Sequence, residues 1–323
     1  MPFSTSRSAV LPCLAVLVAL SVAPSAGAQR RTRFTSDDRS RIDTTFVFDK
    51  SGTVTVSAMN GDIVVTGVAG NQIHVRASSD GDNLRLDASS NRVMLEAILG
   101  GRRSDNDSHL ELSVPFGTRV IARTQSGDIG VHGTRGEVEV HAQSGDIRVD
   151  DVANRLDINT LSGDIIVHNV VGDAVVGTTS GSVKVSDIRG NADIGTVSGD
   201  IELRGVTAKT VRAKTTSGDV TFDGLIDPTG RYELVAHSGD VNLNIQREAS
   251  AQLTISTWNG GIESQFPITL RPGEHGIGSS TSKKFTFEIG GGAARISAET
   301  FSGDVTISAN GRGASSPSPE RRP

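Results

Sequence analysis

Divided every eighteen residues, residues 126–200 read SGDIGVHGTRGEVEVHAQ, SGDIRVDDVANRLDINTL, SGDIIVHNVVGDAVVGTT, SGSVKVSDIRGNADIGTV and SGD. Ser-Gly returns at a strict period, and Asp follows it in four of the five copies. A fixed period of this size is typical of a solenoid, in which each repeat forms one coil. We expect Gly at this corner to supply a positive φ and Ser to hydrogen-bond the turn. The predicted structural corner glycines are Gly127, Gly145, Gly163, Gly181, Gly199, Gly218, Gly239 and Gly303.

Apolar residues alternate with polar ones on both sides of the corner. Before the corner, Val140 and Ala142 recur as Ile158 and Thr160 in the next copy, and after it Ile147 is followed at period two by Val149. Period-two alternation indicates a strand with one buried face. Each coil is therefore predicted to hold two short strands, the Ser-Gly-Asp corner and a looser corner. The fold class is all-β, a parallel β-solenoid of about 18–21 residues per coil, with coils stacked about 4.8 Å apart.

The chain divides into four predicted parts. Residues 1–28 read as a signal peptide, with Arg7 before a short apolar run and a small-x-small cleavage site at 26–28. Residues 29–41 are a disordered leader, and 310–323 a disordered tail rich in Ser, Pro and Arg. Residues 42–309 form the solenoid domain: irregular coils at 42–121, regular repeats at 122–262, and an excursion with a terminal coil at 263–309. Insertions, such as the one at 227–230, are expected at the looser corner.

Composition narrows the setting of the mature chain. The single cysteine, Cys13, lies within the signal, so the mature chain must fold without disulfides in an oxidising compartment. After the signal, 31 Lys and Arg stand against 37 Asp and Glu, a formal net charge of −6. That balance argues against a nucleic-acid partner and a polybasic membrane patch. No later segment is long and apolar enough to span a membrane, so we expect an exported protein of the periplasm, outer surface or extracellular space.

Three features together resemble a known family. They are the first corner at 60–63 (NGDI), the step VPFG at 114–117, and the serial Ser-Gly-Asp corners. They are similar to the bacterial putative-adhesin family, a β-helical domain of unknown function related to the head domain of putative autotransporter adhesins. The resemblance covers about residues 46–307. It implies a single-stranded, right-handed β-helix that is exported or associated with the envelope, and it supplies no active site or ligand.

The repeated Asp is the first candidate site. Stacked carboxylates suggest a cation ladder, formed by Asp128, Asp146, Asp164, Asp200, Asp219 and Asp240. However, one carboxylate per coil falls short of the six to eight oxygens that Ca²⁺ takes, and the Gly-rich nonapeptide of calcium-binding β-rolls is missing. We therefore favour a structural role for Asp at the turn. His132, Asp150 and His168 also share one column, for which a solvated polar face is favoured over a metal site. No metal or other cofactor is predicted.

The residue just before each corner Ser is the second candidate. Alternation points this column outward, yet several of its members are apolar. A contiguous exposed apolar stripe marks a contact surface, and an aromatic ridge can stack on sugar rings. The alternative is that the corner or the excursion after residue 262 covers these side chains. The candidate contact surface consists of Leu161, Val197, Trp258 and Phe301.

The sequence thus predicts a non-enzymatic binding or structural module of the cell envelope, with adhesion implied by the resemblance alone. Its partner is an envelope protein or a glycan, and its solenoid ends offer a route to self-association. The alternatives are a carbohydrate-active β-helix enzyme and a periplasmic envelope-stress component. Such an enzyme needs paired carboxylates that interrupt the repeat, whereas the Asp residues here follow it, and no catalytic motif is present.

Overall fold

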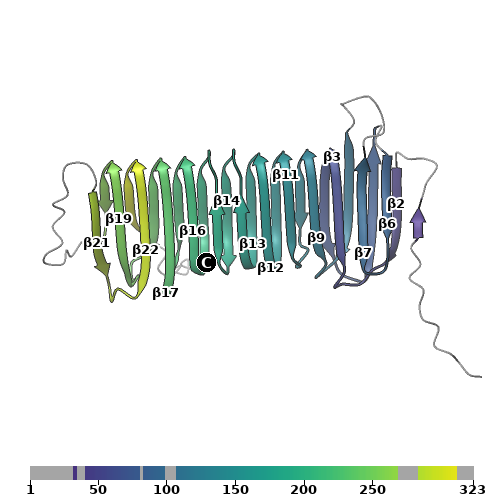
Figure 1. The fold of residues 1–323 in the computed structure, drawn as a ribbon. Coiled ribbons are helices and arrows are strands. Elements are labelled where there is room, and N and C mark those ends of the chain that lie inside the picture. Colours follow the sequence, from purple (N-terminus) through teal and green to yellow (C-terminus); the bar gives the residue numbers. More distant parts are fainter. Residues whose placement is uncertain (1–31, 35–40, 81–82, 99–106, 268–282, 311–323) are drawn as a thin grey trace, which may run out of the picture. The chain divides into compact units, whose positions relative to one another are not determined.

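The computed structural model describes residues 32–34, 41–80, 83–98, 107–267 and 283–310 (Figure 1). Every regular element within these ranges is a β-strand, and the strands join in one hydrogen-bonded network. The predicted signal peptide and residues 311–323 of the predicted tail lie outside them. Across the described ranges, no helix has the length and apolarity needed to cross a membrane. The prediction of an all-β, solenoid-like fold is confirmed, and the handedness stays a prediction.

The strands lie in two sheets that meet at the Ser-Gly-Asp corner. The before-corner sheet contains β3 (Thr53–Asn60), β9 (Arg119–Ser126), β11 (Val138–Ser144), β15 (Ala192–Gly195), β19 (Ala251–Asn259) and β22 (Ala294–Ser302). The after-corner sheet contains β4 (Asp62–Val68), β10 (Ile129–His132), β14 (Val183–Arg189), β18 (Val241–Gln246), β20 (Ile262–Ser264) and β23 (Val305–Asn310). Four longer strands run through the looser corner and contribute to both sheets: β12 (Ile147–Ser162), β13 (Ile165–Gly177), β16 (Ile201–Ser217) and β17 (Val220–Ser238).

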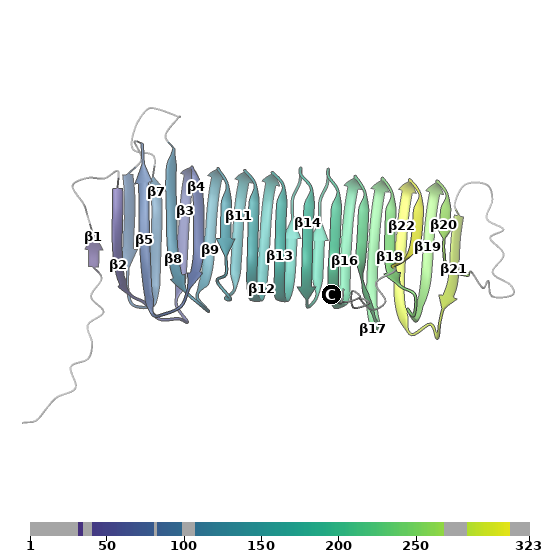
Figure 2. The same cartoon turned by 180° about the vertical axis from the view of Figure 1, so that it is seen from behind.

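Register within the sheets follows the sequence period. Ile129 of β10 pairs with Ile147 of β12, which in turn pairs with Ile165 of β13, all in parallel. Val140 of β11 pairs with Ile158 in the same way, and all these side chains are buried. Because a parallel register places equivalent residues side by side, the apolar columns of successive coils form one continuous core between the two sheets. Figures 1 and 2 show this stack of strands from its two sides.

In β12, β13, β14, β16 and β17 the looser corner is a bend within a paired strand rather than a loop. Residues one coil apart adopt a positive φ there, at Asp151, Asn169 and Asp187. Asn and Asp tolerate this left-handed conformation better than other L-residues, which explains their recurrence just before the buried Val152 and Val170. The insertion at 227–230 falls at this corner as predicted, since Ile226 pairs with Ala208 and Arg231 already with Thr210.

At the N-terminal end the coil of β3 and β4 is followed outward by strands of mixed direction. β7 (Arg92–Ile98) and β8 (Ser108–Pro115) run parallel to β3 and β4, whereas β6 (Asn83–Ala88) and β5 (Gln72–Ser79) run antiparallel to β7 and β8. These antiparallel layers explain why the period is hidden between residues 64 and 120. β1 (Thr32–Phe34) and β2 (Arg41–Val47) then pair with β6 and β5. Part of the stretch expected as a disordered leader is thus extended and pairs with strand edges that would otherwise be open.

At the C-terminal end the stacking order departs from the chain order. β22 lies between β17 and β19, with which it pairs in parallel, and β23 lies between β18 and β20. Figure 1 shows the yellow strand β22 between the greener β17 and β19. β21 (Lys283–Ile289) then pairs antiparallel with the outer edge of β19. The last coil in the sequence, formed by β22 and β23, therefore lies in the stack between the coil of β17 and β18 and the coil of β19 and β20.

Candidate contact surface beside the corner

The corner brings the main chains of neighbouring coils very close together. The corner glycines have φ between +119° and +154°, which confirms the predicted conformation. In addition, a Cβ placed on Gly163 would lie 2.1 Å from the carbonyl oxygen of Gly145 on the preceding coil. Such a contact is impossible without moving backbone, so Gly is required here for its lack of a side chain as well as for its φ.

The Asp of each corner hydrogen-bonds to the neighbouring coil. Asp128 Oδ1 accepts the main-chain N–H of Asp146 at 2.8 Å, and Asp146 Oδ1 accepts that of Asp164 at 2.9 Å. Where Ser182 replaces Asp, it still donates its N–H to Asp164. We call the whole set the Asp ladder: Asp62, Asp128, Asp146, Asp164, Asp200, Asp219, Asp240 and Asp304. Its carboxylates connect one coil to the next, which accounts for the repetition of Asp.

Titratable side chains on the after-corner sheet pair locally. His132 Nδ1 lies 2.8 Å from Asp150 Oδ2, whereas His168 Nδ1 contacts Ser186 at 2.9 Å and Asp187 at 3.4 Å. The three members of the predicted column therefore do not converge on one point. Within the described ranges, no group of three or more His, Cys, Asp or Glu side chains has the arrangement of a metal site.

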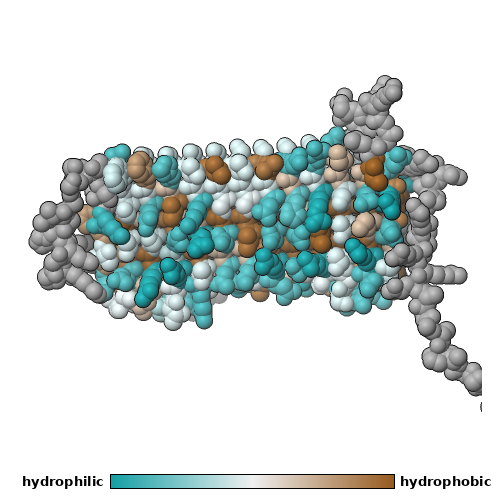
Figure 3. All heavy atoms as spheres, viewed as in Figure 1, coloured by the Kyte–Doolittle hydropathy of each residue, from teal (hydrophilic) through white to brown (hydrophobic). Residues whose placement is uncertain are grey.

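The column before the corner Ser is exposed, as its predicted outward direction requires. The four side chains of the predicted contact surface expose about half of their area: Leu161 58%, Val197 49%, Trp258 43% and Phe301 42%. In Figure 3, brown apolar side chains are spaced along the upper edge of the molecule among paler ones. Leu161 and Val197 belong to coils two apart, with the polar Thr179 between them. They are isolated apolar positions in this column.

Trp258 and Phe301, in contrast, are brought into contact. The two rings stack with centroids 5.8 Å apart and planes inclined by 16°. On its other side Phe301 stacks on His237 at 5.0 Å and 13°. The insertion of β22 between β17 and β19 produces this order, because it places residue 301 between residues 237 and 258. We call His237, Phe301 and Trp258 the ring stack.

The ring stack changes what this surface can bind. His237 also directly precedes a corner Ser and so belongs to this column, but the predicted contact surface contains only apolar members of the column and leaves it out. Both faces of Phe301 are now occupied by its neighbours, so this ring presents its edge outward. Stacking of a sugar on a ring requires a free face, which Phe301 lacks. The ring stack instead offers an apolar ridge of ring edges.

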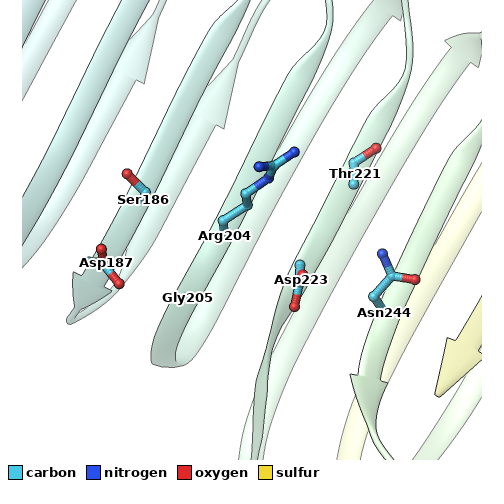
Figure 4. A pocket seen from close by; sticks show the side chains of 7 residues that line it. All are labelled: Ser186, Asp187, Arg204, Gly205, Thr221, Asp223 and Asn244. Atoms are coloured by element: carbon cyan, nitrogen blue, oxygen red, sulfur yellow. The ribbon is translucent and has the colours of Figure 1, made fainter. Parts of the chain in front are cut away.

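A shallow hollow of about 320 Å³ on the outer surface, near the looser corner, is lined by polar residues and is drawn in Figure 4. Its side chains come from several neighbouring strands and stand apart from one another: Ser186, Asp187, Arg204, Thr221, Asp223 and Asn244. Arg204 forms an ion pair with Glu202. The spread of these groups resembles a solvated sheet surface more than a catalytic site.

Residues 44–308 match the model of the family described as Toastrack DUF4097. The chain belongs to this family. The match covers the whole stretch over which the sequence resembles the bacterial putative-adhesin family, and it confirms that resemblance. No curated protein matches the chain.

Two crystal structures are similar to the Toastrack chain. One is a putative cell adhesion protein from Clostridium sporogenes ATCC 15579, with 8% identity, a TM-score of 0.21 and coverage of 84% of this chain and 100% of that chain. The other is a putative adhesin from Bacteroides fragilis NCTC 9343, with 11% identity, a TM-score of 0.36 and coverage of 83% and 96%.

Proposed function

We propose that this chain is an exported, non-enzymatic binding module of the cell envelope with an adhesin-like role. Its scaffold is a right-handed β-helix, and its contact surface is the ring stack together with the apolar positions of the same column, Val197 and Leu161. Membership of the Toastrack family and the predicted signal peptide support the setting. The exposed ring stack is the observation that carries the proposal.

Three adjacent exposed rings favour a partner on physical grounds. Removing apolar surface from water contributes about 25 cal/mol per Å², so covering Trp258 and Phe301 is favourable. The rings are already held in place by stacking on neighbouring strands. Little conformational freedom is therefore lost when a partner covers them, which raises affinity. Aromatic side chains of this kind dominate the binding energy of protein interfaces.

The competing enzyme hypothesis relies on acidic side chains, which here have another role. The recurrent carboxylates belong to the Asp ladder, and they accept main-chain amides of the neighbouring coil. A glycoside hydrolase needs two carboxyl groups facing each other across a groove. The Asp ladder runs instead along one edge with one carboxylate per coil, which supports a role in the scaffold.

Retention on cell envelopes tests the proposal. The purified full chain is incubated with envelope fractions and whole cells, and bound protein is compared with that of a Trp258→Ser, Phe301→Ser variant. We expect the variant to lose most of the retention. The matched control is the Gln125→Ser, Gln143→Ser variant. It changes two exposed positions of the same column on coils far from the ring stack, and it should bind like the unmodified chain.

Two results would overturn the proposal. Equal retention of the ring variant and the unmodified chain would show that the contact surface lies elsewhere. No retention of the unmodified chain, together with release of sugars from a polysaccharide panel, would replace the binding module with the enzyme. Thermal unfolding of each variant serves to exclude a loss of fold.

A further inference from the structure

Charges on the outer face of the before-corner sheet alternate along one column. Each residue of this column stands directly before a buried residue of the before-corner sheet. In stacking order from the N-terminal end, the column consists of Arg119, Glu137, Arg155, Asp173, Asn191, Thr210, Arg231, Arg295 and Gln252. Its arginines on the N-terminal coils have carboxylate partners. Arg119 lies 3.5 Å from Glu137, and Arg155 lies 3.0 Å from Asp157. These charges are neutralised within the protein.

Arg231 and Arg295 break this alternation. They are direct register partners on β17 and β22, so two guanidinium groups project from neighbouring strands. Like charges directly opposite each other destabilise a sheet. Across the described part of the chain, neither side chain has a carboxylate within 4.0 Å. The pair arises from the insertion of β22, because the two residues are far apart in the sequence.

The nearest carboxylates already have other partners. Glu233, next but one to Arg231, lies 2.6 Å from the Lys214 ammonium and 3.2 Å from Arg212 Nε. Glu299 accepts the hydroxyl of Ser297 at 2.9 Å. Neither of these carboxylates neutralises the two arginines, so the N–H groups of both guanidinium forks are left to solvent or to a ligand.

A hollow of about 330 Å³ lies over this pair. Arg231 and Arg295 line it together with the amide of Gln252, the hydroxyls of Thr254 and Ser297, and the carboxylates of Glu233 and Glu299. Tyr232 and Ile296, both almost fully buried, complete the lining. Planar guanidinium groups bind carboxylate and phosphate oxygens in a bidentate manner, and hydroxyl and amide groups complement sugar hydroxyls. The lining thus combines two cationic forks and neutral polar groups with two carboxylates: Glu233 is paired with Lys214 and Arg212, and Glu299 accepts the hydroxyl of Ser297.

We propose that the hollow at Arg231 and Arg295 binds the oxyanion groups, carboxylate or phosphate, of an acidic polysaccharide. The proposal goes beyond the proposed function, since it adds a second contact site that contains none of the ring-stack residues. A polysaccharide fits better than a peptide because the apolar residues of the lining, Tyr232 and Ile296, are almost fully buried and leave mainly polar groups for a ligand to contact. It fits better than a lipid surface because, among the described residues, none of the exposed large apolar side chains lines the hollow and could enter a bilayer beside the arginines.

Calorimetric titration of the full chain tests the site. The probes are polygalacturonate and phosphorylated dextran as acidic polymers, unmodified dextran as the neutral polymer, and vesicles of phosphatidylglycerol with phosphatidylcholine as the lipid surface. We expect binding of the acidic polymers alone, weakened when NaCl rises from about 0.05 M to about 0.5 M because salt screens the guanidinium charges. The Arg231→Gln, Arg295→Gln variant should lose roughly tenfold in affinity, since two charge-assisted contacts are removed.

The matched control is Arg119→Gln, Arg155→Gln, which changes the net charge equally in the same column but removes arginines that are already paired. It should keep its affinity within about twofold, on the scale of long-range screening alone. Equal losses in both double variants, equal binding of unmodified dextran, or binding to the vesicles alone would overturn the proposal. If the Arg231 and Arg295 variant keeps its affinity while the ring variant loses envelope retention, the oxyanion site fails and the binding module stands.

Discussion

Asp146 Oδ1 accepts the main-chain N–H of Asp164 at 2.9 Å, and the two residues hold the same corner position on neighbouring coils. A side chain thereby supplies a link between coils at the point where the main chain turns and the regular sheet bonding changes direction. The same link recurs along the Asp ladder, so each corner is fastened to the next by its own carboxylate. This relationship makes the role of Asp testable.

Replacing Asp146 by Ala removes the acceptor for the Asp164 amide, whereas Asn keeps an oxygen in the same place. We expect Asp146→Ala to lower the free energy of unfolding by about 1 kcal/mol, the usual contribution of one hydrogen bond at an exposed site. Asp146→Asn should remain within about 0.5 kcal/mol of the unmodified chain for the same reason. Urea unfolding measures both values. A larger loss in Asn than in Ala would contradict the acceptor role.

Calcium should not bind to the Asp ladder. One carboxylate per coil, with one oxygen already bonded to an amide, offers too few ligands for an ion that takes six to eight. Isothermal titration with CaCl₂ is expected to give no binding heat with the unmodified chain or with Asp146→Asn, Asp164→Asn. Heat in the unmodified chain that disappears in the variant would establish a cation site instead.

Adding a methyl group at a corner glycine should be far more damaging than adding one at an open turn. In Gly163→Ala the new Cβ would clash with the Gly145 carbonyl, so we expect a loss of about 3 kcal/mol. Gly70 is the control, because its φ is also positive at +129° but no atom lies within 4 Å of its Cβ position. Gly70→Ala should lose only about 1 kcal/mol, from backbone strain alone. Equal losses measured by urea unfolding would exclude the contact between coils as the cause.

Acidification should weaken the ion pairs around Glu233. In the folded chain the Lys214 ammonium and, to a smaller extent, the Arg212 guanidinium hold the pKa of the Glu233 carboxyl below its ordinary value of 4.5. The ionised form therefore stabilises the folded state above the unfolded pKa, and this contribution is lost as the pH falls through the lower folded pKa. We expect about 0.5 kcal/mol at neutral pH, the scale of a surface ion pair.

Unfolding free energies at pH 7 and below pH 4 measure this contribution. Glu233→Gln should remove it, so the variant should lose less stability on acidification than the unmodified chain. Glu248→Gln is the control, since Glu248 forms no ion pair with the described part of the chain. The explanation fails if the two variants show the same dependence on pH.

Much of the scaffold could be predicted from the residues themselves. The corner glycines, the inward columns and the placement of the 227–230 insertion at the looser corner all agree with the structure. The reason is local, since φ preferences and period-two alternation act within a few residues of each position. The positive φ at Asp151 and Asn169 was missed, although Asp and Asn recurring one coil apart is a signal for such a bend.

By itself, the sequence determined the coil: its period, its corner and which side chains point into the core. Only the tertiary structure decided which coils are neighbours at the two ends, and with it the contacts of Phe301 with His237 and Trp258 and the pairing of Arg231 with Arg295. The physical reason is that every coil presents the same hydrogen-bonding edge and similar apolar columns. A repeat therefore encodes how coils stack but not in which order, and both proposed contact sites depend on that order.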